Sequence, residues 1–128
     1  RIVPETIINL LNKKKIVIRS NGKLKRDYVY VDDVVRCLYR SLEVCRMTNT
    51  CEQINILTGS SVSIDELVNL LSKEINVVVN KTYSDLPKGD PEQSLGTTDK
   101  MLRLLGTDLE GMEQISNGLH KTIKFLRS

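Results

Sequence analysis

Aromatic residues and histidine are scarce in this chain. Its 128 residues include four Tyr, one Phe, no Trp and a single His, His120. Proteins that bind single-stranded RNA usually stack bases on several aromatic rings, so we expect no nucleic-acid partner. The three cysteines form no Cys-x-x-Cys pair, so neither a zinc site nor a disulfide framework is indicated, and we expect no metal. Free thiols fit a reducing compartment, most simply the cytoplasm.

Long apolar runs are also absent. No run approaches the roughly 18 residues that a membrane-spanning helix needs, so we expect no membrane partner. The first residues, Arg1 to Glu5, lack the apolar core and the cleavage site of a signal peptide. Because the chain does not begin with Met, we expect it to be a fragment, or a chain whose front has been removed.

The overall composition is that of an ordinary globular domain. Hydrophobic residues make up 40% and charged residues 27% of the chain, which argues against disorder and fibrous repeats. The net charge is only +3, but it is unevenly distributed. Residues 1–46 hold 11 basic and 5 acidic residues, whereas residues 47–128 hold 8 and 11. An anionic ligand would therefore be attracted to the first third of the chain.

The apolar spacing predicts helices that alternate with short strands. The predicted helices are 4–12, 63–75, 99–105 and 112–126, together with a helix of about 14 residues that follows an N-cap at Asp32. The predicted strands are 16–18, 28–31, 53–57 and 77–79. This order predicts an α/β class, in the form of a small α+β lobe with short strands.

Three local signals carry further expectations. A capping box from Ser63 to Glu66 opens the third predicted helix. Residues 80–97 contain two of the three prolines and read as a long irregular loop, which is usually functional or mobile. In the second predicted helix, apolar side chains at helical spacing predict one buried stripe, made of Val35, Leu38, Tyr39, Leu42 and Cys45.

An ordered set of motifs runs along almost the whole chain, from residue 1 to 127. The motifs are Ile2–Pro4 before a helix, Arg26–Val35, Asn55–Gly59, Ser63–Leu67, Gly89–Asp90 and Leu104–Gly106. This order resembles the C-terminal part of NAD-dependent nucleotide-sugar epimerases and dehydratases, which are extended short-chain dehydrogenases. The strongest stretch of the resemblance is Arg26–Val35.

The resemblance implies a lobe without its catalytic partner. The family's N-terminal Rossmann lobe carries a Gly-rich dinucleotide loop and a Tyr-x-x-x-Lys pair. Here Asp32 and Glu43 stand four positions after Tyr28 and Tyr39, and no Gly-rich loop occurs. We therefore predict that residues 1–128 are a sugar-nucleotide-binding C-terminal domain. The absent N-terminal domain of the full-length enzyme would bind NAD(P). The fragment alone is predicted to bind no NAD and to be inactive.

The resemblance also implies a substrate and a set of binding residues. The substrate would be a UDP-, CDP- or dTDP-hexose, and the full-length enzyme a homodimer. Arg26 matches the Arg that contacts the substrate's diphosphate, and Arg1 stands where dehydratases have a substrate-binding Lys. The strand residues Val17, Ile18 and Arg19 match a segment that lies along the base and ribose.

Two further positions follow the same pattern less closely. Asn55 matches an Asn that approaches the nucleotide, although Leu57 stands where the family usually has Gly. Pro87 occupies the place of an Arg that binds the second phosphate, so Lys88 would substitute as a flexible point charge.

Four of these residues have a simpler structural alternative. Arg26 could be a surface side chain paired with Asp27 or Asp32, Val17 and Ile18 could be core strand residues, and Asn55 could bond to a neighbouring loop. The leading functional hypothesis is the substrate-binding lobe of a nucleotide-sugar epimerase or 4,6-dehydratase. The alternatives are a stand-alone, non-catalytic binding module, and a general anion or RNA binder that uses residues 13–26.

Overall fold

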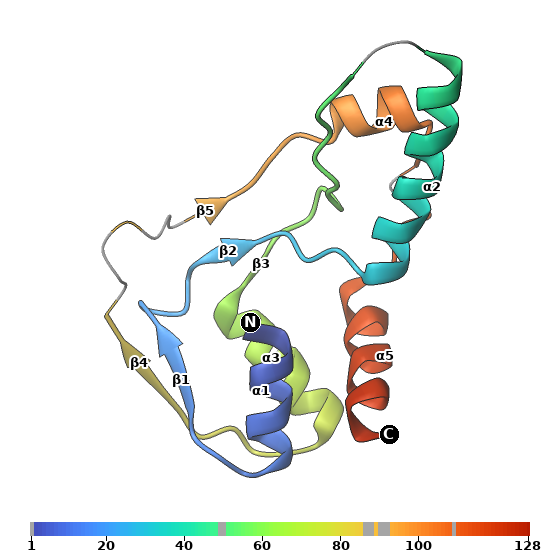
Figure 1. The fold of residues 1–128 in the computed structure, drawn as a ribbon. Coiled ribbons are helices and arrows are strands. Elements are labelled where there is room, and N and C mark those ends of the chain that lie inside the picture. The colour runs from blue at the N-terminus through green and yellow to red at the C-terminus, as the bar shows by residue number, and fades with distance from the viewer. Residues whose placement is uncertain (1, 49–50, 86–88, 90–92, 109) are drawn as a thin grey trace. The chain divides into compact units, whose positions relative to one another are not determined.

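The computed structural model describes residues 2–48, 51–85, 89, 93–108 and 110–128 (Figure 1). The chain divides into two compact units. The first contains Arg1–Arg26, Val62–Ser94 and Ser116–Ser128, and the second contains Asp27–Ser61 and Leu95–Ile115. Helices and short strands alternate along the chain, which confirms the predicted fold class.

The first unit is built around two packed helices, α1 (Ile2–Leu11) and α3 (Ile64–Ile75). The residues that the helical spacing placed on one face of α3 are all buried: Ile64, Leu67, Val68, Leu71 and Ile75. In α1, Ile7 and Leu10 are buried, and α5 (Ile115–Arg127) contributes buried Leu119 and Ile123. The apolar periodicity therefore located the buried face of α3 correctly.

The capping box at the start of α3 is formed as predicted. The Ser63 hydroxyl accepts a hydrogen bond from the Glu66 backbone N–H at 3.2 Å, and the Glu66 carboxylate accepts one from the Ser63 N–H at 2.8 Å. These bonds satisfy two backbone donors that the first turn of a helix leaves without partners. The helix ends at Asn76, which adopts the left-handed conformation (φ 59°) typical of a helix C-terminus.

We expect the Ser63→Ala substitution to lower the free energy of unfolding of the first unit by about 1 kcal/mol.

The bonds from Ser63 hold the pKa of Glu66 below its ordinary 4.5. A carboxyl with a lowered pKa stabilises the fold above pH 4.5, and this contribution disappears as the pH falls through the folded-state pKa. The stability difference between the native chain and Glu66→Gln should therefore be largest near neutral pH and vanish in acid, as measured by urea unfolding from pH 7 to pH 3. A pH-independent difference would contradict this assignment.

Two small sheets complete the first unit. Strand β1 (Ile16–Arg19) pairs in parallel with β4 (Lys81–Ser84), with Ile16 opposite Lys81. Strand β2 (Lys25–Arg26) lies between β3 (Val62–Ser63), which is antiparallel to it, and β5 (Gln93–Ser94), which is parallel. The predicted strand at 16–18 is confirmed.

Other predicted strands are wrong. Residues 28–30 lead into a helix instead of pairing, because Tyr30 is already the N-cap residue of α2 (Val31–Met47). Residues 77–79 join the end of α3 to β4 without forming a ladder. β-Branched runs favour an extended backbone, but pairing also needs a neighbouring strand in register. The predicted loop at 80–97 contains β4 and β5, and its residues 86–88 and 90–92 lie outside the described part of the chain.

The second unit pairs α2 with α4 (Asp99–Leu105). Its buried cluster consists of Cys37, Met101 and Leu105, with Val44, Ile54, Ile56 and Leu102 packed against it. Burial raises the pKa of the Cys37 thiol, which therefore stays protonated and acts as a small apolar side chain. The bounds of α4 are those predicted, and Gly106 follows the helix in the left-handed conformation (φ 58°).

Several predictions for α2 are wrong. The helix starts one residue before Asp32, so this residue lies in the first turn and is not the cap. Asp33 is buried instead, and its carboxylate accepts hydrogen bonds from the Arg36 guanidinium at 2.6 Å and the Glu113 N–H at 2.8 Å. The side chains of the predicted buried stripe are exposed: Val35, Leu38, Tyr39, Leu42 and Cys45. The α2 helix is apolar on two sides, and periodicity does not show which side a neighbour covers.

The predicted strand at 53–57 is also wrong, since these residues take part in no ladder among the residues that the structure describes. Among all the residues that the structure describes, no helix is both long enough and apolar enough to cross a membrane.

Candidate functional site

Arg26 lies on the central strand of the three-stranded sheet. Its backbone is held on both sides, opposite Val62 in β3 and opposite Ser94 in β5. The side chain is half-buried, and its Nη1 donates to the Lys25 carbonyl at 2.8 Å. A guanidinium on a backbone fixed in this way is well suited to pairing with two phosphate oxygens at once.

The residue after Arg26 is anchored by an interaction that the sequence did not predict. The Asp27 carboxylate accepts hydrogen bonds from the Thr58 N–H at 3.0 Å, the Thr58 hydroxyl at 2.7 Å and the Gly59 N–H at 3.0 Å. The Asp27 carboxylate therefore anchors the backbone at Thr58 and Gly59. The sequence signal for this position was the adjacent pair Arg26 and Asp27. It could not show that Asp27 accepts these hydrogen bonds, because the Thr58 donors lie 31 residues further along the chain.

The three predicted residues of β1 point in alternating directions. Ile18 is fully buried, whereas Val17 is 61% exposed and Arg19 is also exposed. The side chain of Ile18 is therefore part of the core, as the structural alternative for this residue states. Only the backbone of Ile18 could contact a ligand. Val17 and Arg19 lie on the opposite face of the strand, where their side chains are exposed.

A pocket of about 360 Å³ lies between α1 and β1. It brings Val17 and Arg19 together with Lys15, Glu5 and Asn9. Sequence reasoning missed the last three residues. Glu5 and Asn9 are four residues apart and so share a face of α1, which is a signal that could have identified them.

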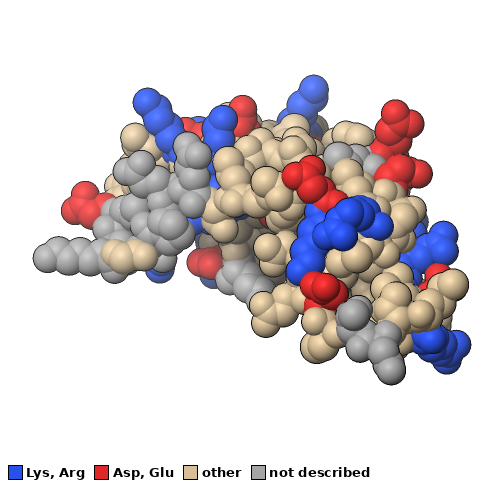
Figure 2. Space-filling model, turned by 90° about the horizontal axis from the view of Figure 1, so that it is seen from above, with Lys and Arg blue, Asp and Glu red and all other residues tan. Residues whose placement is uncertain are grey.

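The pocket combines positive charge with an apolar base. Lys15 and Arg19 are its described cations and Glu5 its described anion, while Ile16, Leu24 and Ile64 are buried at its base. On the face drawn in Figure 2, Lys and Arg side chains are interspersed with Asp and Glu, so this view displays no large patch of one sign. Any attraction for an anion is therefore local. A pocket with cations at its edge and an apolar base can accept a flat ring with phosphates attached.

Strand β4, which holds β1 in place, is tied to α3. Lys81 Nζ contacts Asp65 Oδ1 at 2.8 Å, and the Tyr83 hydroxyl lies 3.1 Å from both oxygens of the same carboxylate. The hydrogen bond to Asp65 raises the pKa of Lys81 above its ordinary 10.5. Gly22 packs against this carboxylate at φ 77°, where a Cβ atom would lie 2.5 Å from Asp65 Cγ. These contacts hold β4 against α3, and β4 pairs with β1 beside the pocket.

The roles of the remaining predicted site residues stay predictions. Asn55 is exposed and belongs to the second unit, so its nucleotide contact stays a prediction. Arg1 and Lys88 lie outside the residues that the structure describes.

Two of the described glycines, Gly22 and Gly59, are already engaged with carboxylates and do not form a cradle for a dinucleotide. Gly22 packs against the Asp65 carboxylate, and the Gly59 N–H donates to the Asp27 carboxylate. Both glycines therefore face acidic groups, which would repel a pyrophosphate. We derive no contact with NAD from the residues of this chain.

Comparison with known proteins gives a consistent result. The family model described as "NAD dependent epimerase/dehydratase family" matches residues 1–56. A UDP-glucuronate 4-epimerase from Thermodesulfobacterium geofontis is 26% identical over 117 residues, covering 91% of this chain and 34% of that protein. Protein CapI from Staphylococcus aureus is 23% identical, covering 89% of this chain and 38% of its own length.

Solved structures agree over nearly the full chain. The UDP-glucuronic acid 4-epimerase from Bacillus cereus, in complex with UDP-glucuronic acid and NAD, matches with a TM-score of 0.88 and 25% identity. The UDP-glucose 4-epimerase from Thermotoga maritima, with UDP-glucose, matches with a TM-score of 0.88 and 28% identity. Each match covers 99% of this chain but only 40% and 39%, respectively, of the solved chain.

These matches confirm the predicted resemblance to the NAD-dependent epimerase/dehydratase family. The chain has the fold of one part of such enzymes and spans well under half the length of the proteins it matches.

Proposed function

We propose that this chain is the substrate-binding lobe of an NAD-dependent nucleotide-sugar 4-epimerase or 4,6-dehydratase, and that it holds the nucleotide diphosphate of the substrate. The observation that carries the proposal is Arg26, which stands on a strand paired on both sides and is followed directly by the anchored Asp27. The pocket beside Val17 and Arg19 supports it by offering a place for the base and ribose.

In this proposal the chain contributes binding, and hydride chemistry belongs to the NAD-containing part of the full-length enzyme. Holding the nucleotide diphosphate fixes the sugar at the other end of the substrate. Binding energy from such remote groups lowers a reaction barrier when it positions the reacting atoms. In the Bacillus cereus enzyme, of which this chain matches 40%, UDP-glucuronic acid and NAD are bound together.

We expect Arg26→Ala, in the polypeptide that carries this lobe, to weaken nucleotide binding at least about tenfold. A hydrogen bond to a charged group contributes about 1.5–3 kcal/mol, and about 1.4 kcal/mol corresponds to one decade in affinity. Isothermal titration calorimetry with UDP, CDP and dTDP measures the change and also identifies the preferred base.

The matched control is Lys25→Ala, which removes a neighbouring cation from the same strand. Lys25 is exposed and alternates with Arg26, so it faces the opposite side of the sheet. Its loss should leave affinity nearly unchanged. Equal affinities of the native and Arg26→Ala proteins for all three nucleotides would show that Arg26 is only a surface residue.

A further inference from the structure

A second pocket, of about 350 Å³, lies at the carboxyl ends of α1 and α3. Figure 1 shows both helices ending at the same end of the first unit. Six of its lining residues come from the two segments that follow these helices: Lys13, Lys14, Asn76, Val77, Val78 and Asn80. We call it the helix-end pocket. It shares no lining residue with the pocket beside Val17 and Arg19, so it is separate from the proposed nucleotide site.

The backbone of both segments is held in place. The Lys14 N–H donates to the Asn9 carbonyl at 2.8 Å, and the Val77 N–H donates to the Ser72 carbonyl at 3.1 Å. These bonds occupy carbonyl groups near the helix ends, whose partial negative charge would otherwise repel an anion. The pocket is therefore formed without a ligand, as small-molecule sites usually are.

The lining of the helix-end pocket contains positive charge and no acidic side chain. Its cations are Lys13 and Lys14, and the ion pairs found between described residues use neither of them. The side-chain amides of Asn76 and Asn80 add hydrogen-bond donors. An anionic group is the polar partner that suits this lining.

Apolar side chains occupy the rest of the lining. Leu10 is buried, Val77 is half-buried and Val78 is 96% exposed. A simple anion would leave these apolar surfaces in water, whereas an aliphatic chain would cover them. The volume lies at the lower end of the range for small-molecule sites, so the pocket suits a ligand smaller than a sugar nucleotide.

We propose that the helix-end pocket binds a small amphiphilic anion, in which a carboxylate or phosphate group is joined to a short aliphatic chain. The head group pairs with Lys13 and Lys14, and the chain lies against Val77 and Val78. Charge alone accounts for only the lysines, and apolar surface alone accounts for only the valines. A ligand that combines both properties matches the whole lining, and this inference does not depend on the proposed nucleotide site.

Isothermal titration calorimetry tests the proposal in the polypeptide of natural length that carries this lobe. The probes are octanoate and hexyl phosphate, which distinguish a carboxylate from a phosphate head group. We expect the tighter of the two to bind with a Kd of about 1 mM or lower. Acetate and inorganic phosphate, which lack the long chain, should bind at least about tenfold more weakly.

Two substitutions locate the binding. Val78→Asp adds a negative charge to the lining and removes an apolar contact, and we expect it to weaken binding of the tighter probe at least about tenfold. Because Val78 is so exposed, the far-UV circular dichroism and the affinity for UDP should stay unchanged. Lys14→Ala removes one exposed cation and should weaken binding about two- to fivefold.

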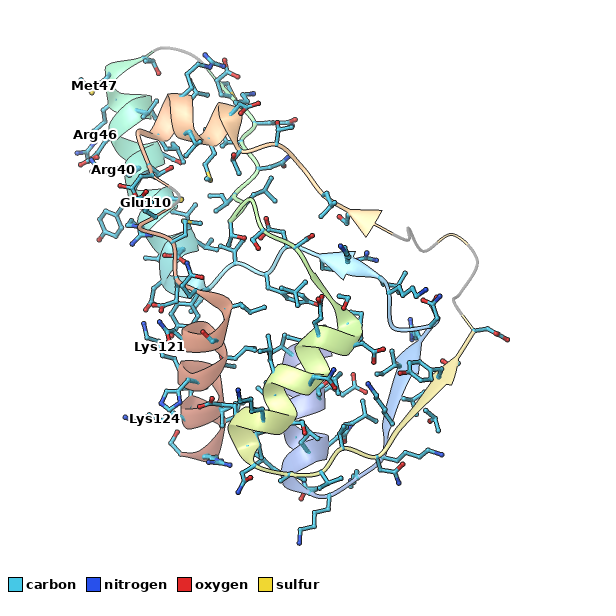
Figure 3. The ribbon with its side chains drawn as sticks, turned by 180° about the vertical axis from the view of Figure 1, so that it is seen from behind. Arg40, Arg46, Met47, Glu110, Lys121 and Lys124 are labelled. Atoms are coloured by element: carbon cyan, nitrogen blue, oxygen red, sulfur yellow. The ribbon has the colours of Figure 1, made fainter. Side chains whose placement is uncertain are left out.

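The matched control is Lys124→Ala, which removes one positive charge from the last turn of α5. Figure 3 shows Lys121 and Lys124 projecting from the side of α5 that is turned away from α3, so Lys124 lies outside the helix-end pocket. Its loss should leave the affinity for the probe nearly unchanged. Equal weakening by Lys14→Ala and Lys124→Ala would show a general attraction to surface charge and overturn the proposal.

Methyl NMR spectra of the native protein test the site without any substitution. The methyl resonances of Val77 and Val78 should shift when the tighter probe is added. A bound probe that leaves both residues unshifted would lie elsewhere on the molecule, and the proposal would then be wrong. The absence of measurable binding by both octanoate and hexyl phosphate would also overturn it.

Discussion

The Leu67→Ala substitution should lower the free energy of unfolding of the first unit by about 2–5 kcal/mol. Leu67 is fully buried in the middle of α3, on the face that packs against α1. Truncation removes apolar contacts and leaves a cavity that rigid helix packing fills only partly. Urea unfolding followed by far-UV circular dichroism measures the change.

A matched control exists in the same unit. Val78 is 96% exposed, so Val78→Ala removes a similar kind of side chain without opening a cavity. We expect its effect to lie within about 0.5 kcal/mol of zero. Similar losses for Leu67→Ala and Val78→Ala would mean that α3 does not form the core described here.

The Asp27→Ala substitution is expected to have the second large effect. It removes the acceptor of three donors, the Thr58 N–H, the Thr58 hydroxyl and the Gly59 N–H, within the second unit. Each hydrogen bond to a charged group contributes about 1.5–3 kcal/mol when it is shielded from water. Because Asp27 is only half-buried, we expect a total loss of about 3 kcal/mol rather than the full sum, measured by urea unfolding.

The conservative variant Asp27→Asn separates shape from charge. It keeps one oxygen acceptor and introduces an amide NH₂, which cannot accept from the second donor. We expect it to lose roughly half as much stability as Asp27→Ala, and both variants to weaken UDP binding in the natural-length polypeptide, because Asp27 fixes the backbone next to Arg26. Full stability of Asp27→Ala would show that water replaces the carboxylate at no cost and that the turn at Thr58 is held by other contacts.

Elements with strong local signals were predicted well from the sequence. The apolar repeat from Ile64 to Ile75 and the capping box at Ser63 located α3 and its buried face. The predicted helix at 99–105 coincides with α4, and the β-branched residues 16–18 located β1. All of these signals act within one or two helical turns or within one strand, so their physical causes are contained in the local sequence.

Elements whose state depends on a distant partner were predicted less well. Residues 28–31, 53–57 and 77–79 have strand-like composition, yet no strand of the described chain pairs with them. The stripe from Val35 to Leu42 has the spacing of a buried face, yet it is exposed. Hydrophobic periodicity identifies a surface that can be buried, and the presence of a neighbour determines whether it is.

For the candidate site, the motif around Arg26 indicated a phosphate-binding cation, but the sequence did not show how it is held. The pairing of Arg26 between Val62 and Ser94, the anchoring of Asp27 by Thr58, and the pocket shared by Lys15 and Glu5 are formed by residues far apart in the chain.

The sequence by itself determined the α/β class, the buried face of α3 and the resemblance to one family, because residue spacing and motif order are properties of the chain. Only the tertiary structure decided that Ile18 is a core residue, that Asp27 anchors a turn and that one apolar face of α2 is left uncovered. These features depend on which surfaces meet, and contacts between distant segments are set by the packing of the whole fold rather than by local spacing.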